Sequence, residues 1–119
     1  MREQHMIGSG IPPGMVNGIK GTIGTGISAA GTSVSDATAL TNDYNVVSTV
    51  AAGAGVVLPS GFAGDEVSVL NTGANPLLVY APSGGTLNGH TADVGAVLPK
   101  KSCAKFVYQS TTAVWCFFG

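Results

Sequence analysis

The stretch over residues 55–80 restricts the possible folds more than any other part of the chain. Residues 66–70, Glu-Val-Ser-Val-Leu, alternate polar and apolar side chains with the period of a β-strand. Residues 71–76, Asn-Thr-Gly-Ala-Asn-Pro, then interrupt this pattern with turn-forming residues. A second apolar run follows. The order of strand, turn and strand predicts an antiparallel hairpin in which Leu70 pairs with Leu77.

Short strands separated by turn signals recur about every ten residues over residues 33–119, and no segment there has the pattern of a long amphipathic helix. In the last predicted hairpin, pairing of Phe106 with Phe117 and of Tyr108 with Trp115 would place an aromatic ladder in the core. We therefore predict an all-β fold, an antiparallel β-sandwich or jelly-roll-like domain over residues 33–119. The side chains predicted to be buried are Phe62, Val67, Val69, Tyr80, Phe106, Trp115 and Phe117.

Residues 1–32 differ from the rest of the chain and are predicted to form an extended, Gly-rich N-terminal arm. Their eight glycines disfavour both a helix and an isolated sheet, and Pro12-Pro13 excludes a helix interior. Apolar side chains nevertheless recur at every fourth position, which is unusual for a disordered tail. This combination fits an arm that lies on a neighbouring subunit or shell; a flexible tail is the alternative. The recurring residues are Ile7, Ile11, Met15, Ile19, Ile23 and Ile27.

The low charge of the chain points to assembly. Only 9 % of the residues are charged, against about 25 % in typical soluble domains. The surface must therefore consist of small uncharged residues or be covered by other chains. The formal net charge of −1 argues against a nucleic-acid partner, because phosphate binding needs a basic patch. The predicted subunit contacts of the β domain are Val46, Val47, Val56, Val57 and Leu58.

Sequence features also bear on compartment and redox state. The first ten residues lack the apolar segment of a signal peptide. No run approaches the ~20 apolar residues of a membrane helix, so we expect synthesis in a cytosol and no membrane partner. In the predicted last hairpin, Cys103 and Cys116 do not face each other. We therefore expect two free, small, buried thiols.

No pattern in the sequence predicts catalytic residues, a cofactor or a metal. Asp65 and Glu66 are adjacent on a strand, so their carboxylates point to opposite faces and do not form a catalytic pair. His5 and His90 are the only histidines, and neither has metal-ligand spacing with the cysteines. The glycines match neither the dinucleotide fingerprint nor the P-loop. The polar residues that remain as candidates for touching a sugar or an ion are Asn88, His90 and Asp93.

Several short phrases together carry a family resemblance. They include Ala30-Gly31-Thr32, Val46-Val47-Ser48-Thr49-Val50, Gly55-Val56-Val57-Leu58-Pro59, Val69-Leu70-Asn71-Thr72-Gly73-Ala74-Asn75 and Leu87-Asn88-Gly89. With these phrases, residues 30–119 resemble the small structural proteins of tailed bacteriophages. Such proteins occur as head decoration (cement) proteins and as β modules of other virion proteins. The pair Lys100-Lys101 departs from the family pattern, which usually has small residues there.

The resemblance implies a structural virion protein with no enzymatic activity. It would be a capsid decoration or cement protein that stabilises a bacteriophage head through oligomeric β domains and an N-terminal arm. The implied partners are further copies of the chain, as a homotrimer at local three-fold positions, and the major capsid protein. The implied location is the capsid surface of the virion, after synthesis in the bacterial host cytoplasm. The alternative is a receptor- or glycan-binding β module of a phage tail or fibre, which the predicted burial of Tyr108 and Trp115 disfavours.

Overall fold

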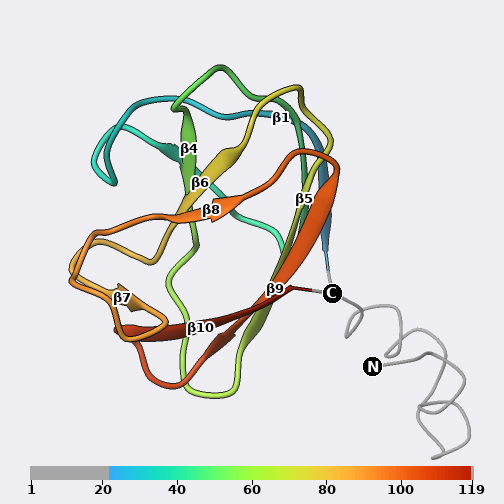
Figure 1. Cartoon of the computed structure of the whole chain (residues 1–119). Helices are drawn as coiled ribbons and strands as arrows, with labels where there is room; N and C mark the ends of the chain where they lie inside the picture. Colours follow the sequence, from blue (N-terminus) through green and yellow to red (C-terminus); the bar gives the residue numbers. More distant parts are fainter. Residues whose placement is uncertain (1–21, 119) are drawn as a thin grey trace, which may run out of the picture.

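The structure is a computed structural model that describes residues 22–118, with side chains up to Cys116. This part of the chain contains strands and no helix, so the all-β prediction is confirmed (Figure 1). The strands are β1 (Ile23–Ser28), β2 (Thr38–Ala39), β3 (Tyr44–Thr49), β4 (Gly55–Val57), β5 (Glu66–Asn71), β6 (Leu77–Tyr80), β7 (Thr86–Leu87), β8 (Ala96–Leu98), β9 (Ser102–Tyr108) and β10 (Ala113–Phe118).

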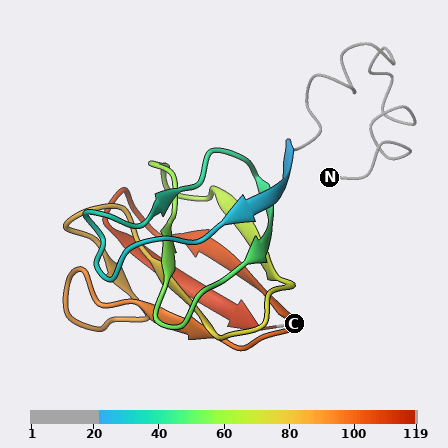
Figure 2. The ribbon, with the colours of Figure 1, turned by 90° about the horizontal axis from the view of Figure 1, so that it is seen from above.

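The strands form two mixed sheets. The larger has six strands in the order β1-β3-β5-β9-β10-β7, and the smaller has four in the order β2-β4-β6-β8. The first six strands alternate between the two sheets, and within each sheet they run parallel (Figure 1 and Figure 2). Antiparallel pairs are restricted to β5 with β9, β9 with β10, and β6 with β8 among the described strands. The prediction of a purely antiparallel arrangement is therefore wrong.

The predicted hairpin between Leu70 and Leu77 is the origin of this error. Leu70 lies opposite Val46 and Cys103 in the six-stranded sheet, whereas Leu77 lies opposite Leu98 in the other sheet. The turn residues 71–76 do not reverse the chain beside itself. They form a corner that carries it from one sheet to the other.

Asn71 holds this corner with a fully buried side chain. Its Nδ2 donates to the carbonyl oxygens of Asn75 (2.9 Å) and Leu98 (3.1 Å). Its Oδ1 accepts from the backbone N–H of Gly73 (2.9 Å). The side chain at the end of β5 is thus bonded to β8 of the opposite sheet. These bonds supply the partners that the buried polar groups of a corner need.

The last hairpin forms between β9 and β10, but its register differs by one residue from the prediction. Tyr108 lies opposite Val114, and Trp115 opposite Val107. A shift of one residue moves every side chain of a strand to the other face. Val114 is consequently buried and Trp115 is 44 % exposed, so the predicted burial of Trp115 is wrong. The side chain of Phe117 lies outside the described residues.

The core lies between the two sheets and consists of aliphatic side chains with two large aromatic ones, Phe106 and Tyr108. Burial of Val67, Val69, Tyr80 and Phe106 is confirmed. Phe62 was predicted to be buried and is instead 74 % exposed. The ring of Tyr108 fills the space beside its loop: a Cβ added at Gly61, the residue before Phe62, would lie 2.8 Å from that ring. Phe62 is left on the loop outside.

The C-terminal part of the predicted arm belongs to the six-stranded sheet, because β1 pairs with β3. The register shifts between Gly24 and Ile27, and Gly26 within this interval has a φ of 66°. Such a bulge adds a residue and turns the following side chain to the other face. Ile23 therefore points outward, whereas Ile27 packs against the core. The other predicted contacts of the arm, Ile7, Ile11, Met15 and Ile19, lie outside the described residues.

Candidate functional site

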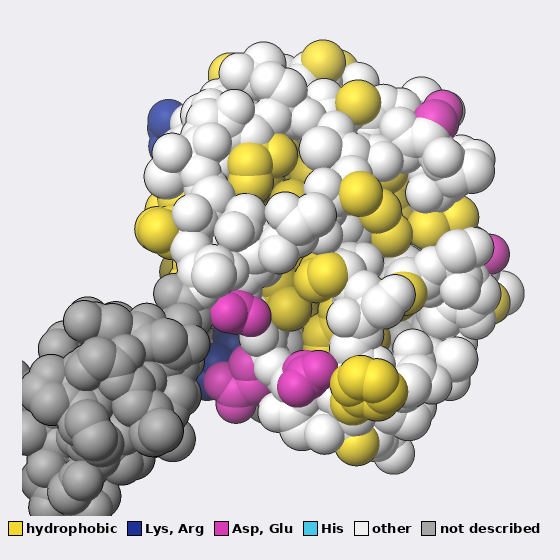
Figure 3. All heavy atoms as spheres, turned by 180° about the vertical axis from the view of Figure 1, so that it is seen from behind, with side chains coloured by type: hydrophobic (Ala, Val, Ile, Leu, Met, Phe, Trp, Pro, Cys, Tyr) yellow, Lys and Arg dark blue, Asp and Glu magenta, His cyan; other side chains and the backbone are white. Residues whose placement is uncertain are grey.

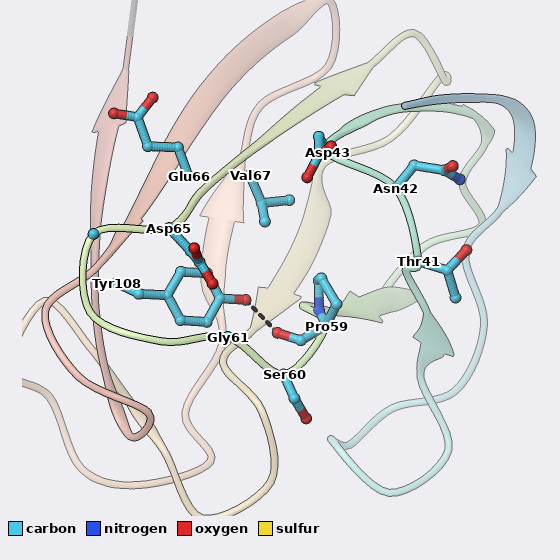
Figure 4. Close-up of a pocket in the computed structure, with 11 residues that line it drawn as sticks. Thr41, Asn42, Asp43, Pro59, Ser60, Gly61, Asp65, Glu66, Val67 and Tyr108 are labelled. Carbon is cyan, nitrogen blue, oxygen red and sulfur yellow. Dashed lines mark hydrogen bonds between the residues drawn. The ribbon is translucent and has the colours of Figure 1, made fainter. Parts of the chain in front are cut away.

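A polar cleft of about 660 Å³ opens between the segment before β3 and the loop that joins β4 to β5 (Figure 4). On the face seen in Figure 3, acidic side chains gather beside a hollow, and most of the remaining surface is neither charged nor apolar. The residues that line the cleft are Thr41, Asn42, Asp43, Pro59, Ser60, Gly61, Gly64, Asp65, Glu66, Val67 and Tyr108.

Each carboxylate of the cleft is engaged in a structural contact. Asp43 Oδ2 accepts the backbone N–H of Thr22 (3.0 Å), which fixes the start of β1. Asp65 Oδ2 accepts the backbone N–H of Phe62 (2.8 Å) and so closes its own loop. Glu66 forms an ion pair of 2.9 Å with Lys105 across β5 and β9. The three carboxylates are therefore directed to three different structural partners.

Tyr108 is the only large aromatic side chain among the lining residues of the cleft, and its hydroxyl serves as a structural hydrogen-bond donor. Its hydroxyl donates to the carbonyl oxygen of Pro59, as the dashed line in Figure 4 shows. Burial, together with the nearby charge of Asp65, raises the pKa of Tyr108 to about 12. The hydroxyl is therefore protonated at neutral pH and is unsuited to act as a base.

A second hollow lies on the outer face of the six-stranded sheet, and its exposed lining is almost entirely apolar. We call this hollow the outer groove; its volume is about 270 Å³. Its most exposed apolar side chains are Ile23 (66 %), Tyr44 (49 %) and Leu70 (37 %), and Cys103 is exposed as well. The residues that line the outer groove are Ile23, Tyr44, Asn45, Val46, Ser68, Val69, Leu70 and Cys103.

Strand register explains why these side chains meet. Ile23, Tyr44 and Ser68 lie side by side in one row across β1, β3 and β5. Val46 and Leu70 lie side by side two residues further along, and Leu70 lies opposite Cys103 of β9. Alternate residues of a strand share one face, so both rows face outward. Four strands contribute to one apolar surface, and none of residues 22–118 covers it.

Only part of the predicted subunit contact of the β domain is at the surface. Val46 lines the outer groove, and Val57 is half-buried. Val47, Val56 and Leu58 are buried between the sheets and are not available to another chain. The sequence prediction had treated each apolar run as one unit, although successive residues of a strand point to opposite faces.

The two predicted buried thiols have different surroundings. Cys103 is exposed in the outer groove, so its predicted burial is wrong. Cys116 lies opposite Phe106 and is half-buried. Burial raises the pKa of the Cys116 thiol, which makes this thiol less reactive near neutral pH.

Of the three polar residues that the sequence offers for contact with a sugar or an ion, Asn88 and Asp93 bond to the protein backbone. Asn88 Oδ1 accepts the backbone N–H of Cys116 (2.8 Å), and Asp93 Oδ1 accepts that of Gly84 (2.7 Å). His90 is exposed. Residues 22–118 contain no cluster of three or more His, Cys, Asp or Glu side chains that could hold a metal ion.

Trp115 is an exposed aromatic residue that the predicted register had hidden. Its ring lies on the outer face of β10, where Nε1 donates to Oε1 of Gln109 (2.6 Å). Gly89 lies beside the ring: a Cβ added there would be 3.6 Å from Cη2. The structure thus presents an indole next to a planar amide, a combination that the sequence-based register had excluded.

Comparisons with family models, with curated proteins and with solved structures find no match to this chain. The described part of the chain has no helix of the length and hydropathy needed to cross a membrane.

Proposed function

We propose that this protein is a structural virion protein, a decoration or cement protein of a tailed-bacteriophage head. The observation that carries the proposal is the outer groove, because an apolar surface that four strands build and the described residues leave exposed is typical of a protein that assembles. The family resemblance supplies the virion as the setting. The surface charge is low enough that the remaining faces also tolerate close contact with other chains.

The state of the polar groups supports a structural role rather than a catalytic one. Asp43 and Asp65 stabilise local backbone, Glu66 pairs with Lys105, and Tyr108 bonds Pro59. General acid–base chemistry requires groups whose environments converge on one substrate position. In the cleft these groups are directed to separate structural partners.

We further infer that β1 to β6 form a short β-solenoid rather than part of a jelly roll. In successive turns Ile23 lies beside Tyr44, and Asn45 beside Val69, so each turn takes about twenty residues. Solenoids need a cap at each end, because an unpaired edge invites further strands. The antiparallel strands β8 and β9 cover the end at β6 and β5. At the other end β1 and β2 are edge strands of their sheets.

The direct test is sedimentation of the purified protein with full phage heads, with the copy number measured per head. We expect saturable binding at a copy number that fits trimers at local three-fold positions, and light scattering of the free protein should show a trimer. A substitution in the outer groove, Leu70→Glu, should weaken attachment or trimer formation. Failure of the wild-type protein to sediment with heads would refute the decoration role, and a monomer at high micromolar concentration would refute the free trimer.

The alternative, a receptor- or glycan-binding module of a phage tail or fibre, is favoured by one observation. Trp115 is exposed beside the amide of Gln109, and aromatic faces next to planar polar groups are suited to stack on sugars. A glycan array followed by calorimetric titration with the bound glycan would test this role. Binding that disappears in Trp115→Ala but survives in Phe62→Ala, a substitution at another exposed aromatic residue, would support it.

A further inference from the structure

The outer groove lies at the point where the N-terminal arm meets the sheet. Thr22 is fixed there by three hydrogen bonds. Its N–H donates to Asp43 Oδ2 (3.0 Å), its Oγ1 accepts the N–H of Asp43 (3.2 Å), and its carbonyl oxygen accepts the N–H of Tyr44 (2.9 Å). The next residue, Ile23, is itself part of the groove wall. Twenty-one residues precede this anchor. The chain outside the described structure therefore begins at the margin of the apolar surface.

The composition of this preceding segment matches the groove. Between His5 and Lys20 there is no charged residue, and apolar side chains recur every four positions. Ile23 continues the same series and already lies in the groove. The exposed lining of the groove is likewise uncharged, with the Lys105–Glu66 ion pair beyond it. An uncharged, isoleucine-rich segment is thus the part of this chain best suited to cover it.

We propose that the outer groove is the docking site for residues 7–19 of a second copy of the chain. This proposal rests on the assembly role proposed above and names the contact that would hold neighbouring subunits together. In extended form these residues span roughly 40 Å at about 3.3 Å per residue. The four strands that line the groove are about 15 Å wide at ~4.8 Å per strand. The segment is therefore long enough to cross the groove and place more than one isoleucine in it.

The position of the anchor favours a second copy over the chain's own segment. If residues 7–19 entered the groove of their own chain, only Lys20 and Gly21 would remain for the chain to reverse its direction before Thr22. A segment from a neighbouring copy enters without this reversal. Exchange of such segments around a ring would link each subunit to the next.

Cys103 provides a direct reporter because it is exposed and lines the groove. The experiment measures the modification rate of Cys103 in the full chain with a maleimide, read by peptide mass spectrometry over a range of protein concentrations. We expect a roughly tenfold slower rate in the concentrated, associated protein than in the dilute one. A full-length arm variant, Ile7→Ser with Ile11→Ser and Ile19→Ser, should lose this protection at every concentration.

A mixing experiment distinguishes exchange from self-docking. The arm variant keeps an intact groove, whereas Leu70→Glu keeps an intact arm. If the segment docks between copies, mixing the two variants should restore slow modification of Cys103 in the arm variant. Cys116 serves as the internal control, because its half-buried thiol should keep one rate in all folded variants. Val97→Ser, at an exposed residue on the other sheet, should behave as wild type.

Two results would overturn the proposal. Protection that persists undiminished on dilution, with no rescue on mixing, would assign the groove to the chain's own segment. Equal modification rates of Cys103 in wild type and in the arm variant at every concentration would show that the segment does not occupy the groove. The proposed function is tested independently of this contact. If Cys103 is protected but the protein does not sediment with heads, the exchange of segments is supported and the decoration role is refuted.

Discussion

Replacement of Asn71 by alanine should be one of the most destabilising single substitutions in the β domain. The Asn71 side chain is fully buried, and it makes three hydrogen bonds at the corner between the sheets. Asn71→Ala would leave the N–H of Gly73 and the carbonyl oxygen of Leu98 buried without these partners. Both residues are themselves buried, so water does not replace the lost bonds.

The expected loss follows from these two groups. Each buried polar group left without a partner costs about 1–3 kcal/mol, so the unfolding free energy should fall by roughly 3–5 kcal/mol. Small domains have only about 5–15 kcal/mol of stability in total. For a domain of this size, a loss of 3 kcal/mol lowers the melting temperature by roughly 12–24 °C.

The assay is urea or thermal unfolding of full-length wild type and Asn71→Ala, with Asn75→Ala as the matched control. Asn75 is half-buried and donates one side-chain bond, to the carbonyl oxygen of Val50 (2.8 Å). Its loss should cost only about 1 kcal/mol. If Asn71→Ala cost no more than Asn75→Ala, the corner would not depend on the Asn71 side chain and the account of the sheet connection would be refuted.

Three further outcomes are expected. Because the pKa of Tyr108 is raised to about 12, absorbance titration should show a tyrosine ionising near pH 12 that is missing in Tyr108→Phe. The folded-state pKa lies above the ordinary value, so this residue's contribution to stability is intact below pH 10 and is lost as pH rises towards 12. Hydrogen bonds from the backbone N–H groups of Ser33 and Thr32 lower the pKa of Asp36. Its contribution is therefore present above about pH 4 and lost as pH falls further, and thermal melts of Asp36→Ala should show a smaller acid-side loss than wild type. Phe62→Ser should change the unfolding free energy, measured by urea denaturation, by less than about 0.5 kcal/mol, because the ring is largely exposed. A larger loss would show that the ring packs in the core.

The positions of most strands after residue 33 could be predicted from the sequence, whereas β1, which was assigned to the arm, and the strand partners could not. Alternation correctly identified Val67 and Val69 as inward-facing, because it depends only on which residues share a face. The turn at residues 71–76 was also identified. A turn signal does not specify whether the chain returns to the same sheet or crosses to another. That choice depends on the bonds of Asn71 to Leu98, a residue 27 positions away.

The register of the last hairpin shows a second limit. On β10 both alternating sets contain large apolar residues, so periodicity does not decide between Val114 and Trp115 as the inward residue. The decision is made by the loop, where the N–H groups of Gln109 and Ser110 both donate to Ala113. A shift of one residue then exposes Trp115 and removes the predicted aromatic ladder.

A signal for the outer groove was nevertheless present in the sequence. Val46-Val47 and Val69-Leu70 are consecutive apolar pairs within strands, and such a pair makes both faces of its strand apolar. The inward members, Val47 and Val69, are fully buried in the core. Among residues 22–118 the outward members, Val46 and Leu70, have no such role, yet strand pairing places them side by side. A sheet covered on one face alone would be expected to carry polar residues at these positions. The docking proposed for the outer groove would explain apolar residues at these positions, and modification of Cys103 tests that contact.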